Sequence, residues 1–269
     1  MTSATALLPI QFDAPLLNPA PVGLLAATSW TDVDGPERHL AGVDINVYNF
    51  GGDESFGVWG ADWCASPEDL TEDDVKEAAD RPAWPDAFEA MTVWARDRCD
   101  LTRASRDDVN KRVQQIIRLR LSHAAEREFA TRLLADITTP DDVADIVAAV
   151  SELESDLADE GIIGLLHAPV KFAAIAMDKG LAARTTGGIL RSPLGHQWVF
   201  GAGYRTILGD KIVATSPTFG WRGPIHLRDN IHFEHNVYNA IAEQTLVIGY
   251  EDLISAVDVV GAPDPEPEP

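Results

Sequence analysis

Three histidines and a glutamate are the most obvious candidates for chemistry in this sequence. His226, His232, Glu234 and His235 lie within ten residues of one another, and imidazole and carboxylate groups are good ligands for a first-row metal. If the segment is a strand with its apolar residues facing a core, His232 and Glu234 share one face and His235 lies on the other. At most two ligands then converge, and no HExxH pair strengthens the site. A solvated strand edge or a subunit contact is the interpretation that we favour.

Glycine-rich stretches are the next group with a chemical interpretation, because glycine loops can bind phosphate. The chain contains neither GxGxxG nor GxxxxGK[ST], so we interpret the clusters at 51–52, 187–188 and 201–209 as turns. Ser216 lies in no GxSxG elbow and is interpreted as a turn residue before Pro217. We therefore assign no catalytic, cofactor-binding or metal-binding residue from the sequence.

The charge balance of the chain is strongly acidic. Its 269 residues include 43 acidic and 21 basic side chains, for a net charge of -22, which repels phosphate backbones and argues against a nucleic-acid-binding role. Simple solubility is an equally good explanation of the same charge. The acidic pairs Asp73–Asp74 and Asp141–Asp142 are predicted to lie at helix starts, where the helix dipole favours carboxylates.

Cysteine content and hydropathy define the broad class of the chain. Cys64 and Cys99 are the only cysteines, too few for a disulfide framework, and we expect both to be reduced, buried thiols. The N-terminus does not resemble a signal peptide. The longest apolar region, residues 161–177, is too short to span a bilayer. Together with a hydrophobic content of 45%, these features predict a soluble globular protein that does not associate with membranes.

Proline and glycine divide the first hundred residues. Residues 1–39 are rich in proline and are predicted to form an extended arm. Residues 40–63 alternate apolar and polar side chains around a glycine-rich turn and predict a β-hairpin. Residues 66–80 predict an acidic helical segment, and residues 88–95 predict a strand.

The strongest helix signal begins at Ser105 and continues without glycine or proline to about Ala135. At 1.5 Å per residue this helix would be roughly 45 Å long. Most of its apolar residues share one arc of the helix, and a second apolar patch lies elsewhere on its surface, so we expect the helix to be covered on two sides. The second patch consists of Leu119, Phe129 and Leu133.

The second half of the sequence mixes helices and strands without a regular βαβ order. A helix is predicted to begin at Thr139–Asp142 and to end at Gly161, and another to run from Pro169 to Gly180. Short strands are predicted at 162–166, 197–200, 211–214 and 224–233.

The end of the chain predicts two adjacent buried strands, because Thr245–Ile248 and Ile254–Val260 are apolar runs separated by a charged break. Residues 261–269 follow with the sequence GAPDPEPEP. Prolines that lack a hydrogen-bond donor and carboxylates that repel one another predict a disordered acidic tail.

Four runs of the second half resemble the major capsid proteins of tailed bacteriophages, in particular those of phages of actinobacteria. They are GIIGLLHAPVKFAAIA, HQWVFGAGY, KIVATSP and NAIAEQTLVIGYED. The resemblance covers residues 100–260 by these runs, and the first hundred residues by element order alone. It implies an α+β chain with the Hong Kong 97-type fold, which encapsulins share.

The resemblance also implies a division of the chain into segments with distinct roles. These are an N-terminal arm (1–39), an extended hairpin loop (40–65), a peripheral domain (66–139) with a spine helix (105–135), an axial domain (140–210), a return to the peripheral domain (211–260) and the acidic tail (261–269).

The implied function is self-assembly as hexamers and pentamers into the icosahedral head shell that encloses the double-stranded DNA of a tailed phage. Copies of the chain are the main partners, with scaffolding, portal and decoration proteins as further ones, and the DNA is packaged without sequence-specific binding. The implied location is the virion, after assembly in the host cytoplasm. Because the hairpin region Leu40–Trp63 has no lysine, we predict assembly without the lysine–asparagine cross-link that some members form.

Two alternatives remain open at this point. An encapsulin-type nanocompartment would use the same shell to hold a cargo enzyme. A soluble metal-dependent enzyme would use His226, His232 and Glu234, and it predicts a small oligomer with bound metal.

Overall fold

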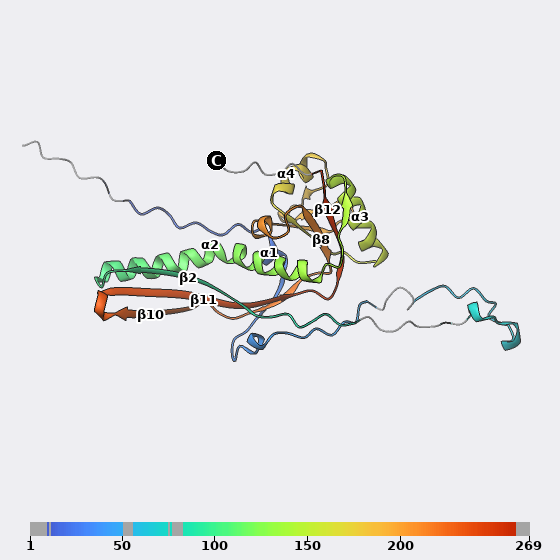
Figure 1. Ribbon diagram of the computed structural model, residues 1–269, viewed down its shortest axis with the longest axis horizontal. Helices are drawn as coiled ribbons and strands as arrows, with labels where there is room; N and C mark the ends of the chain where they lie inside the picture. Colours follow the sequence, from blue (N-terminus) through green and yellow to red (C-terminus); the bar gives the residue numbers. More distant parts are fainter. Residues whose placement is uncertain (1–9, 11, 51–55, 75, 77–82, 262–269) are drawn as a thin grey trace, which may run out of the picture.

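A long helix, α2 (Arg103–Asp136), runs along the body of the protein and contacts both of its β-sheets (Figure 1). The computed structural model describes residues 10, 12–50, 56–74, 76 and 83–261. Within this part, the body consists of a long sheet beneath α2 and a second sheet beside the C-terminal half of α2. The N-terminal arm and a long loop project from the body in different directions (Figure 1).

The N-terminal cap of α2 is Thr102, whose hydroxyl accepts a hydrogen bond from the Ser105 backbone N–H at 3.4 Å. The predicted start at Ser105 is therefore two residues too late, because Ser105 occupies the third helical position and not the cap. The two-sided burial is confirmed: Val109 and Val113 pack on the long sheet, and Phe129 belongs to the core between the two sheets. Leu133 also belongs to this second patch, but Leu119 is 37% exposed and does not.

The long sheet is organised around β11 (Val237–Gly249), a 13-residue strand. One edge of β11 pairs antiparallel with β2 (Met91–Cys99), and the other pairs with β10 (His226–His232) and then β9 (Phe219–Arg222). β1 (Ser29–Asp32) joins β9 in parallel. Strand alternation directs Tyr238, Ala240 and Ala242 toward α2. Among the described residues, no α-helix lies on the opposite face of the half formed by β2, β11 and β10 (Figure 1).

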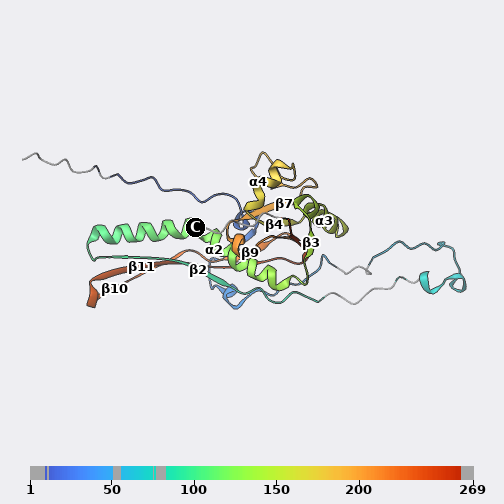
Figure 2. The same ribbon diagram turned by 45° about the horizontal axis from the view of Figure 1, so that its top comes forward.

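The second sheet has the strand order β3-β12-β8-β4-β7-β6-β5 among the described residues. Helices α3 (Ile146–Asp159) and α4 (Lys171–Asp178) cover one of its faces, and the end of α2 covers the other (Figure 2). The strands are β3 (Asp141–Val143), β4 (Leu165–Pro169), β5 (Ala183–Arg184), β6 (Leu190–Arg191), β7 (Gln197–Gly201), β8 (Lys211–Thr215) and β12 (Leu253–Val259).

The last two strands of the chain, β11 and β12, lie in different sheets, which corrects the prediction of two adjacent buried strands. β11 lies in the long sheet, whereas β12 pairs with β8 and β3 in the second sheet. The break at Glu251–Asp252 is thus a crossover between sheets and not a hairpin turn. Residues 211–260, predicted to return together to one domain, are divided between the two sheets in the same way.

The helix predicted to begin at Thr139–Asp142 begins later, at the cap Asp145. The Asp145 carboxylate accepts hydrogen bonds from the backbone N–H groups of Val147 and Ala148 at 2.8 and 2.9 Å. Asp141 and Asp142 belong instead to β3, which pairs in parallel with β12. The predicted end is confirmed, because Gly161 adopts a positive φ of 69° just after α3.

The predicted arm is shorter in the structure than residues 1–39. From Pro21 backward the described residues have neither helix nor strand, and Gln115 of α2 donates a hydrogen bond to the Leu17 carbonyl at 2.7 Å. From Gly23 onward the chain belongs to the body, since Leu24 of α1 (Leu24–Ala27) is fully buried. The 3₁₀ turn η1 (Arg38–Ala41) follows β1.

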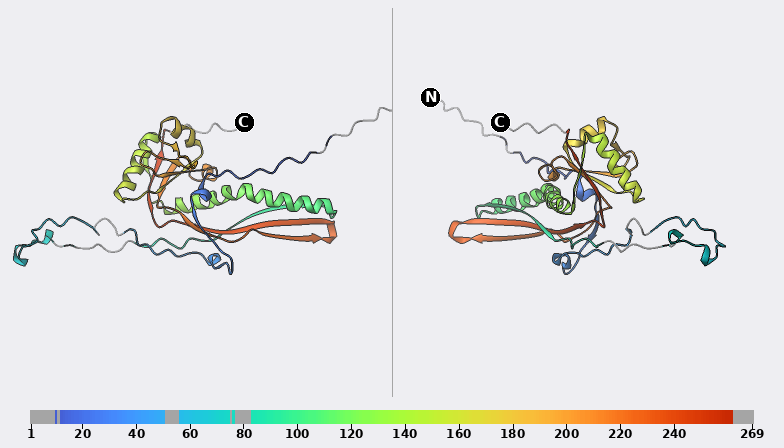
Figure 3. Two further views of the ribbon diagram at one scale, coloured as in Figure 1. Left: turned by 180° about the vertical axis from the view of Figure 1, so that it is seen from behind. Right: turned by 45° about the vertical axis from the view of Figure 1, so that its right-hand side comes forward.

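The predicted β-hairpin at residues 40–63 is wrong for its described part. Val43 forms an isolated antiparallel bridge with Phe88, and the chain between them runs outward and returns as a long loop (Figures 1 and 3). We call residues 43–88 the extended loop. The predicted turn at Gly51–Gly52 lies outside the described residues.

The predicted helix at residues 66–80 is replaced by two 3₁₀ turns in the part that the structure describes. These are η2 (Pro67–Asp69) and η3 (Glu72–Asp74), and most of residues 75–80 lies outside the described part. Acidic residues four positions apart, such as Glu68 and Glu72, repel one another on a helix, which disfavours the predicted continuous helix.

Candidate functional site

The histidine-rich segment is spread over a strand and a 3₁₀ turn, so its four candidate ligands do not converge in the described part of the chain. His226 Nε2 lies 2.7 Å from Glu37 Oε1, whereas His232 is exposed at the end of β10. Glu234 and His235 are exposed in the 3₁₀ turn η5 (Phe233–His235), so the strand alternation assumed for them ends at His232. Among the described residues, no group of three or more histidine, cysteine, aspartate or glutamate side chains is arranged to hold a metal ion.

Glu37 links the segment after β1 to the long sheet. Its carboxylate accepts a hydrogen bond from the Thr245 hydroxyl at 2.7 Å, and the same hydroxyl lies 3.0 Å from His39 Nε2. Because Thr245 donates its proton to Glu37, His39 Nε2 must be the donor to Thr245. The hydrogen bonds from His226 and Thr245 lower the pKa of Glu37. This network holds the chain near residues 37–39 against β10 and β11.

A second cluster of polar side chains lies inside the core, where burial keeps it out of contact with solvent and with any substrate. His167 is fully buried, with Nε2 2.9 Å from the Thr215 hydroxyl and Nδ1 3.0 Å from the Tyr204 hydroxyl. Thr215 donates to the Ser216 carbonyl, so Nε2 of His167 carries a proton and donates it to Thr215. Burial lowers the pKa of His167 to about 3.

Acidification is expected to destabilise the subunit through His167. Its folded-state pKa of about 3 lies below the ordinary value of 6.5, so the unfolded state binds the extra proton as the pH falls below 6.5. Stability is therefore complete above that pH and is lost toward pH 3, with a loss of ~2.5 kcal/mol between pH 7 and pH 4.5. The measurement is urea denaturation of the unassembled subunit at both pH values. In the His167→Gln variant this part of the loss should disappear; an unchanged loss would contradict the prediction.

The glycine clusters and Ser216 have structural roles. A Cβ atom on Gly203 would lie 2.4 Å from the His123 carbonyl oxygen of α2, so glycine permits close packing there. Gly188 has a φ of 83° in a turn closed by its N–H bond to the Thr185 carbonyl. Ser216 Oγ accepts hydrogen bonds from the backbone N–H groups at the start of the crossover to β12. Gly188 thus lies in a turn, as predicted, whereas Gly203 is a close-packing residue that the sequence did not indicate.

Both cysteines are free and exposed, which corrects the prediction of buried thiols. Cys64 lies in the extended loop and Cys99 at the end of β2. No helix in the described part of the chain is long and apolar enough to cross a membrane.

Two charged side chains hold the root of the extended loop. Glu251 accepts hydrogen bonds from the backbone N–H groups of Tyr48 and Asn49, at 2.7 and 2.9 Å, on the outgoing segment. Arg132 of α2 donates to the carbonyls of Asp86 and Ala87, at 3.0 and 3.1 Å, on the returning segment. Partial burial opposes ionisation of Glu251, but the hydrogen bonds from Asn49 and Tyr48 lower its pKa overall. The direction in which the loop leaves the body is therefore fixed by the body.

The far end of the extended loop is itself folded. We call residues 56–74 and 76 the loop tip. Trp59 Nε1 donates to the Asp74 carbonyl at 2.8 Å, and the Lys76 ammonium lies 4.6 Å from the centre of the Trp59 ring. Trp63 packs edge-on against Trp59 with ring centroids 5.4 Å apart. These contacts join the two segments of the loop far from the body (Figure 3).

The arm and the loop expose apolar side chains that the body does not cover. Phe12 of the arm is 81% exposed, and Val58 and Trp63 of the loop tip are 99% and 87% exposed. Clusters of exposed large apolar side chains mark interaction sites. The candidate functional site of this protein is therefore its pair of projecting segments and the surfaces that receive them.

Sequence reasoning did not identify Glu251, Arg132 or Lys76. Glu251 and Arg132 are ordinary charged residues in the sequence, and their partners are backbone groups, which have no sequence signal. Lys76 stands in an acidic segment with few basic residues, and a cation near several tryptophans is a signal that could have found it.

Comparison with solved structures gives likenesses over nearly the whole chain. The capsid of a native GTA particle is 12% identical with a TM-score of 0.54 and covers 94% of each chain. The mature capsid of bacteriophage PhiM1 is 11% identical with a TM-score of 0.52 over 97% of this chain and 93% of that chain. A virus-like particle from Pyrococcus furiosus is 10% identical with a TM-score of 0.50 over 87% and 90%.

Sequence comparison adds nothing to these likenesses. No protein-family model matches the chain, and no curated protein matches it. The structural likenesses, at these low identities, concern the fold alone. They confirm the α+β, Hong Kong 97-type fold expected from the sequence.

Proposed function

We propose, from its Hong Kong 97-type capsid fold, that this protein is the major capsid protein of a tailed bacteriophage. It assembles as hexamers and pentamers into an icosahedral shell around double-stranded DNA. The observation that carries the proposal is the pair of projecting segments with uncovered apolar side chains, on a body whose fold matches capsid structures from end to end. A lone subunit leaves these side chains in water, whereas neighbouring copies would bury them.

Each segment is assigned to the arm, the loop or one of two domains according to the sheet or helix that it contacts. Residues 1–22 are the arm, and the extended loop is residues 43–88, in place of the sequence-based ranges 1–39 and 40–65. The peripheral domain consists of α2 and the long sheet, and the axial domain consists of the second sheet with α3 and α4. In this division β8 and β12 belong to the axial domain.

Copies of the chain are its main partners in this proposal, and the virion is its location after assembly in the host cytoplasm. Scaffolding, portal and decoration proteins contact such a shell as further partners. The net charge of -22 suits a shell that encloses DNA without gripping it. The protein acts as a structural component and not as an enzyme.

Assembly is proposed to be non-covalent, although the extended loop is longer than the range Leu40–Trp63 from which this was predicted. The range Leu40–Trp63 has no lysine, but the extended loop reaches Phe88 and includes Lys76. The Lys76 ammonium is held over the Trp59 ring within its own loop tip, which favours a structural role for it.

Electron microscopy of the protein expressed alone and with a phage scaffold tests the function. The expected result is closed icosahedral shells that, on a denaturing gel, give a single band at the 29.2 kDa of the chain. Discrete monomers at all concentrations in both preparations would contradict the capsid function. A ladder of covalent multimers would contradict non-covalent assembly only.

The content of the particles distinguishes the two alternatives. Shells isolated from the native source that contain a protein cargo and no nuclease-resistant DNA would indicate an encapsulin-type nanocompartment. A small oligomer with stoichiometric metal would indicate a metal-dependent enzyme.

A further inference from the structure

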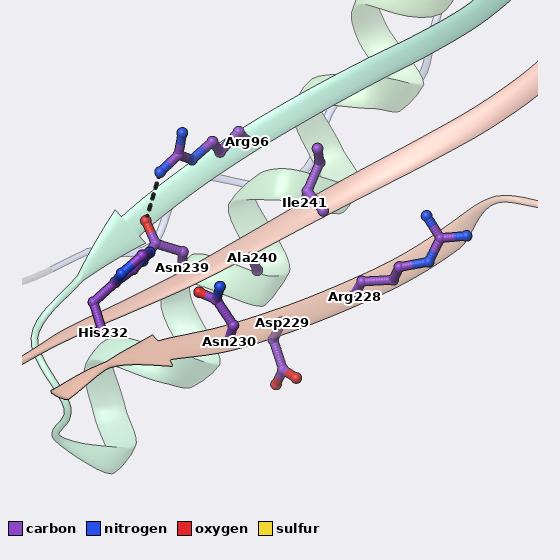
Figure 4. Close-up of a pocket in the computed structure, with 8 residues that line it drawn as sticks. All are labelled: Arg96, Arg228, Asp229, Asn230, His232, Asn239, Ala240 and Ile241. Atoms are coloured by element: carbon purple, nitrogen blue, oxygen red, sulfur yellow. Dashed lines mark hydrogen bonds between the residues drawn. The ribbon is translucent and has the colours of Figure 1, made fainter.

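Two hollows of about 350 Å³ are lined by several charged side chains. The first lies over β2, β10 and β11, where Arg96 donates a hydrogen bond to Asn239 at 2.9 Å and Arg228 is paired with Glu243 (Figure 4). Its arginines therefore have partners within the sheet. The second hollow lies where the extended loop leaves the body, and we call it the root cavity. No described lysine or arginine forms an ion pair with Asp252, which lines it.

The walls of the root cavity come from the extended loop, from the end of α2 and from the crossover between β11 and β12. The loop residues among them are Val47, Phe50, Ala83, Pro85 and Asp86. Asp252, in the crossover, is partly buried. Because the loop forms one wall, closing the root of the loop against the body removes water from the Asp252 carboxylate, and lifting the root restores that water.

The crossover is the point at which the loop and the two sheets are joined. Glu251 accepts hydrogen bonds from the backbone N–H groups of Tyr48 and Asn49 on the outgoing segment of the loop. The backbone N–H groups of Glu251 and Asp252 both donate to Ser216 Oγ, at 2.9 and 3.1 Å, just after β8 of the second sheet. The Asp252 side chain is thus held beside the contact that fixes the direction of the loop.

The titratable and charged groups around Asp252 come from four elements and are mostly acidic. They are Glu160 at the end of α3, Asp86 of the extended loop, Arg132 and Asp136 of α2, and Tyr250 and Glu251 of the crossover. Arg132 is already paired with Asp136 at 2.6 Å. Burial raises the pKa of Tyr250, so its hydroxyl stays neutral. The cavity therefore offers an ionised Asp252 two neighbouring like charges, Glu160 and Glu251, and no counter-charge of its own.

These surroundings favour the protonated form of Asp252. Burial raises the pKa of Asp252 to about 6, and repulsion from Glu160 and Glu251 adds to the effect, whereas a hydrogen bond from the Leu253 backbone N–H opposes it. Although partial burial opposes ionisation of Glu251, the hydrogen bonds from the loop lower its pKa, and it stays ionised near neutral pH. Between pH 5 and pH 7.5, therefore, Asp252 changes its charge while the carboxylate that binds the loop does not.

We propose that Asp252 makes the root of the extended loop a proton-controlled hinge, which is closed when the carboxyl group is protonated and opens more readily when it is ionised. A protonated carboxyl group needs little solvation and can donate a hydrogen bond. An ionised one regains water and is less strongly repelled by its neighbours when the loop residues lift away from the cavity. The hinge is a property of the single subunit and does not depend on the proposed shell function.

Proton binding should stabilise the closed root. The closed state has the higher pKa, about 6, and a solvated Asp252 in the open state has the ordinary value of 3.8. The preference for closure is therefore complete below pH 3.8 and is lost as the pH rises through 6. Between pH 5.0 and pH 7.5 the ratio of closed to open roots should fall about tenfold.

Amide hydrogen exchange in the full-length, unassembled subunit tests the hinge. The backbone N–H groups of Tyr48 and Asn49 report on the root, because opening breaks their bonds to Glu251. Their protection factors, measured by NMR and corrected for the intrinsic exchange rate at each pH, should be about tenfold higher at pH 5.0 than at pH 7.5. Asp252→Asn keeps the shape of the side chain without its charge and should give high protection at both pH values. Asp86→Asn, at an exposed carboxylate of the same cavity, is the matched control and should keep the tenfold difference.

Three results would overturn the hinge. Equal protection at both pH values in the unsubstituted protein is the first, and it decides the matter even if a variant does not fold. A tenfold difference that persists in Asp252→Asn would show that another group is responsible. Loss of the difference in Asp86→Asn as well would show that the total charge of the cavity, and not Asp252, controls the root. Circular dichroism and thermal unfolding first establish that the three proteins are folded alike.

Discussion

Replacement of residues 51–83 by a glycine-serine linker is expected to abolish shell formation and to leave a folded subunit. Of the loop residues that the structure describes, those that contribute to the three apolar cores lie near its root and are Val43, Ile45 and Phe88. The root contacts of Glu251 and Arg132 involve residues 48–49 and 86–87, which the replacement retains. The deleted part carries the exposed apolar side chains Val58 and Trp63, which are proposed to be buried against neighbouring copies.

The measurement combines electron microscopy with size-exclusion chromatography. A linker of about eight residues has a root-mean-square span of ~16 Å, enough to join the two loop segments near their root. We expect monomers or small oligomers with the thermal unfolding of a cooperative domain. Shells in normal yield would show that the extended loop is dispensable for assembly. An unfolded product from the eight-residue linker is to be checked with a longer one, because strain at the junction would then be relieved.

Elements with local signals could be predicted from the sequence. β7 and β8 are short apolar runs between turn residues, and both are found within one residue of the predicted bounds. α2 has no interior glycine or proline and a clear apolar arc, so its existence was predictable. Its N-terminal cap was predicted at Ser105 but is Thr102. The fold class followed from family-like runs in the second half and not from the pattern of elements.

Features that depend on distant contacts could not be predicted. An apolar strand such as β12 gives no indication of which of two sheets it joins, so its separation from β11 could not be deduced. The course of the extended loop could not be deduced either, because the hydrogen bonds that fix its root come from Glu251 and Arg132, far away in sequence. A glutamate in the middle of a helix is normally solvated, so no sequence signal indicated that Glu126 is buried.

Glu126→Ala is expected to cost the subunit ~3–5 kcal/mol of unfolding free energy, the largest effect of a single substitution that we predict. The Glu126 side chain is almost fully buried, and its carboxylate accepts hydrogen bonds from three other residues. The donors are Leu24 N at 3.3 Å, the Ser122 hydroxyl at 2.9 Å and Gly203 N at 2.9 Å. One carboxylate thus connects α1, α2 and the 3₁₀ turn η4 (Gly203–Thr206).

The size of the effect follows from the groups that alanine leaves behind. The N–H groups of Leu24 and Gly203 are buried and would lose their acceptor, at about 1–3 kcal/mol each. Glu126→Gln keeps one acceptor oxygen but places an amide N–H₂ against these donors, so an intermediate loss is expected. Urea denaturation of the unassembled subunit measures all variants. Glu128→Ala, two positions along and exposed, should change stability by less than about 0.5 kcal/mol. Equal losses at positions 126 and 128 would show that the buried carboxylate does not hold the three segments together.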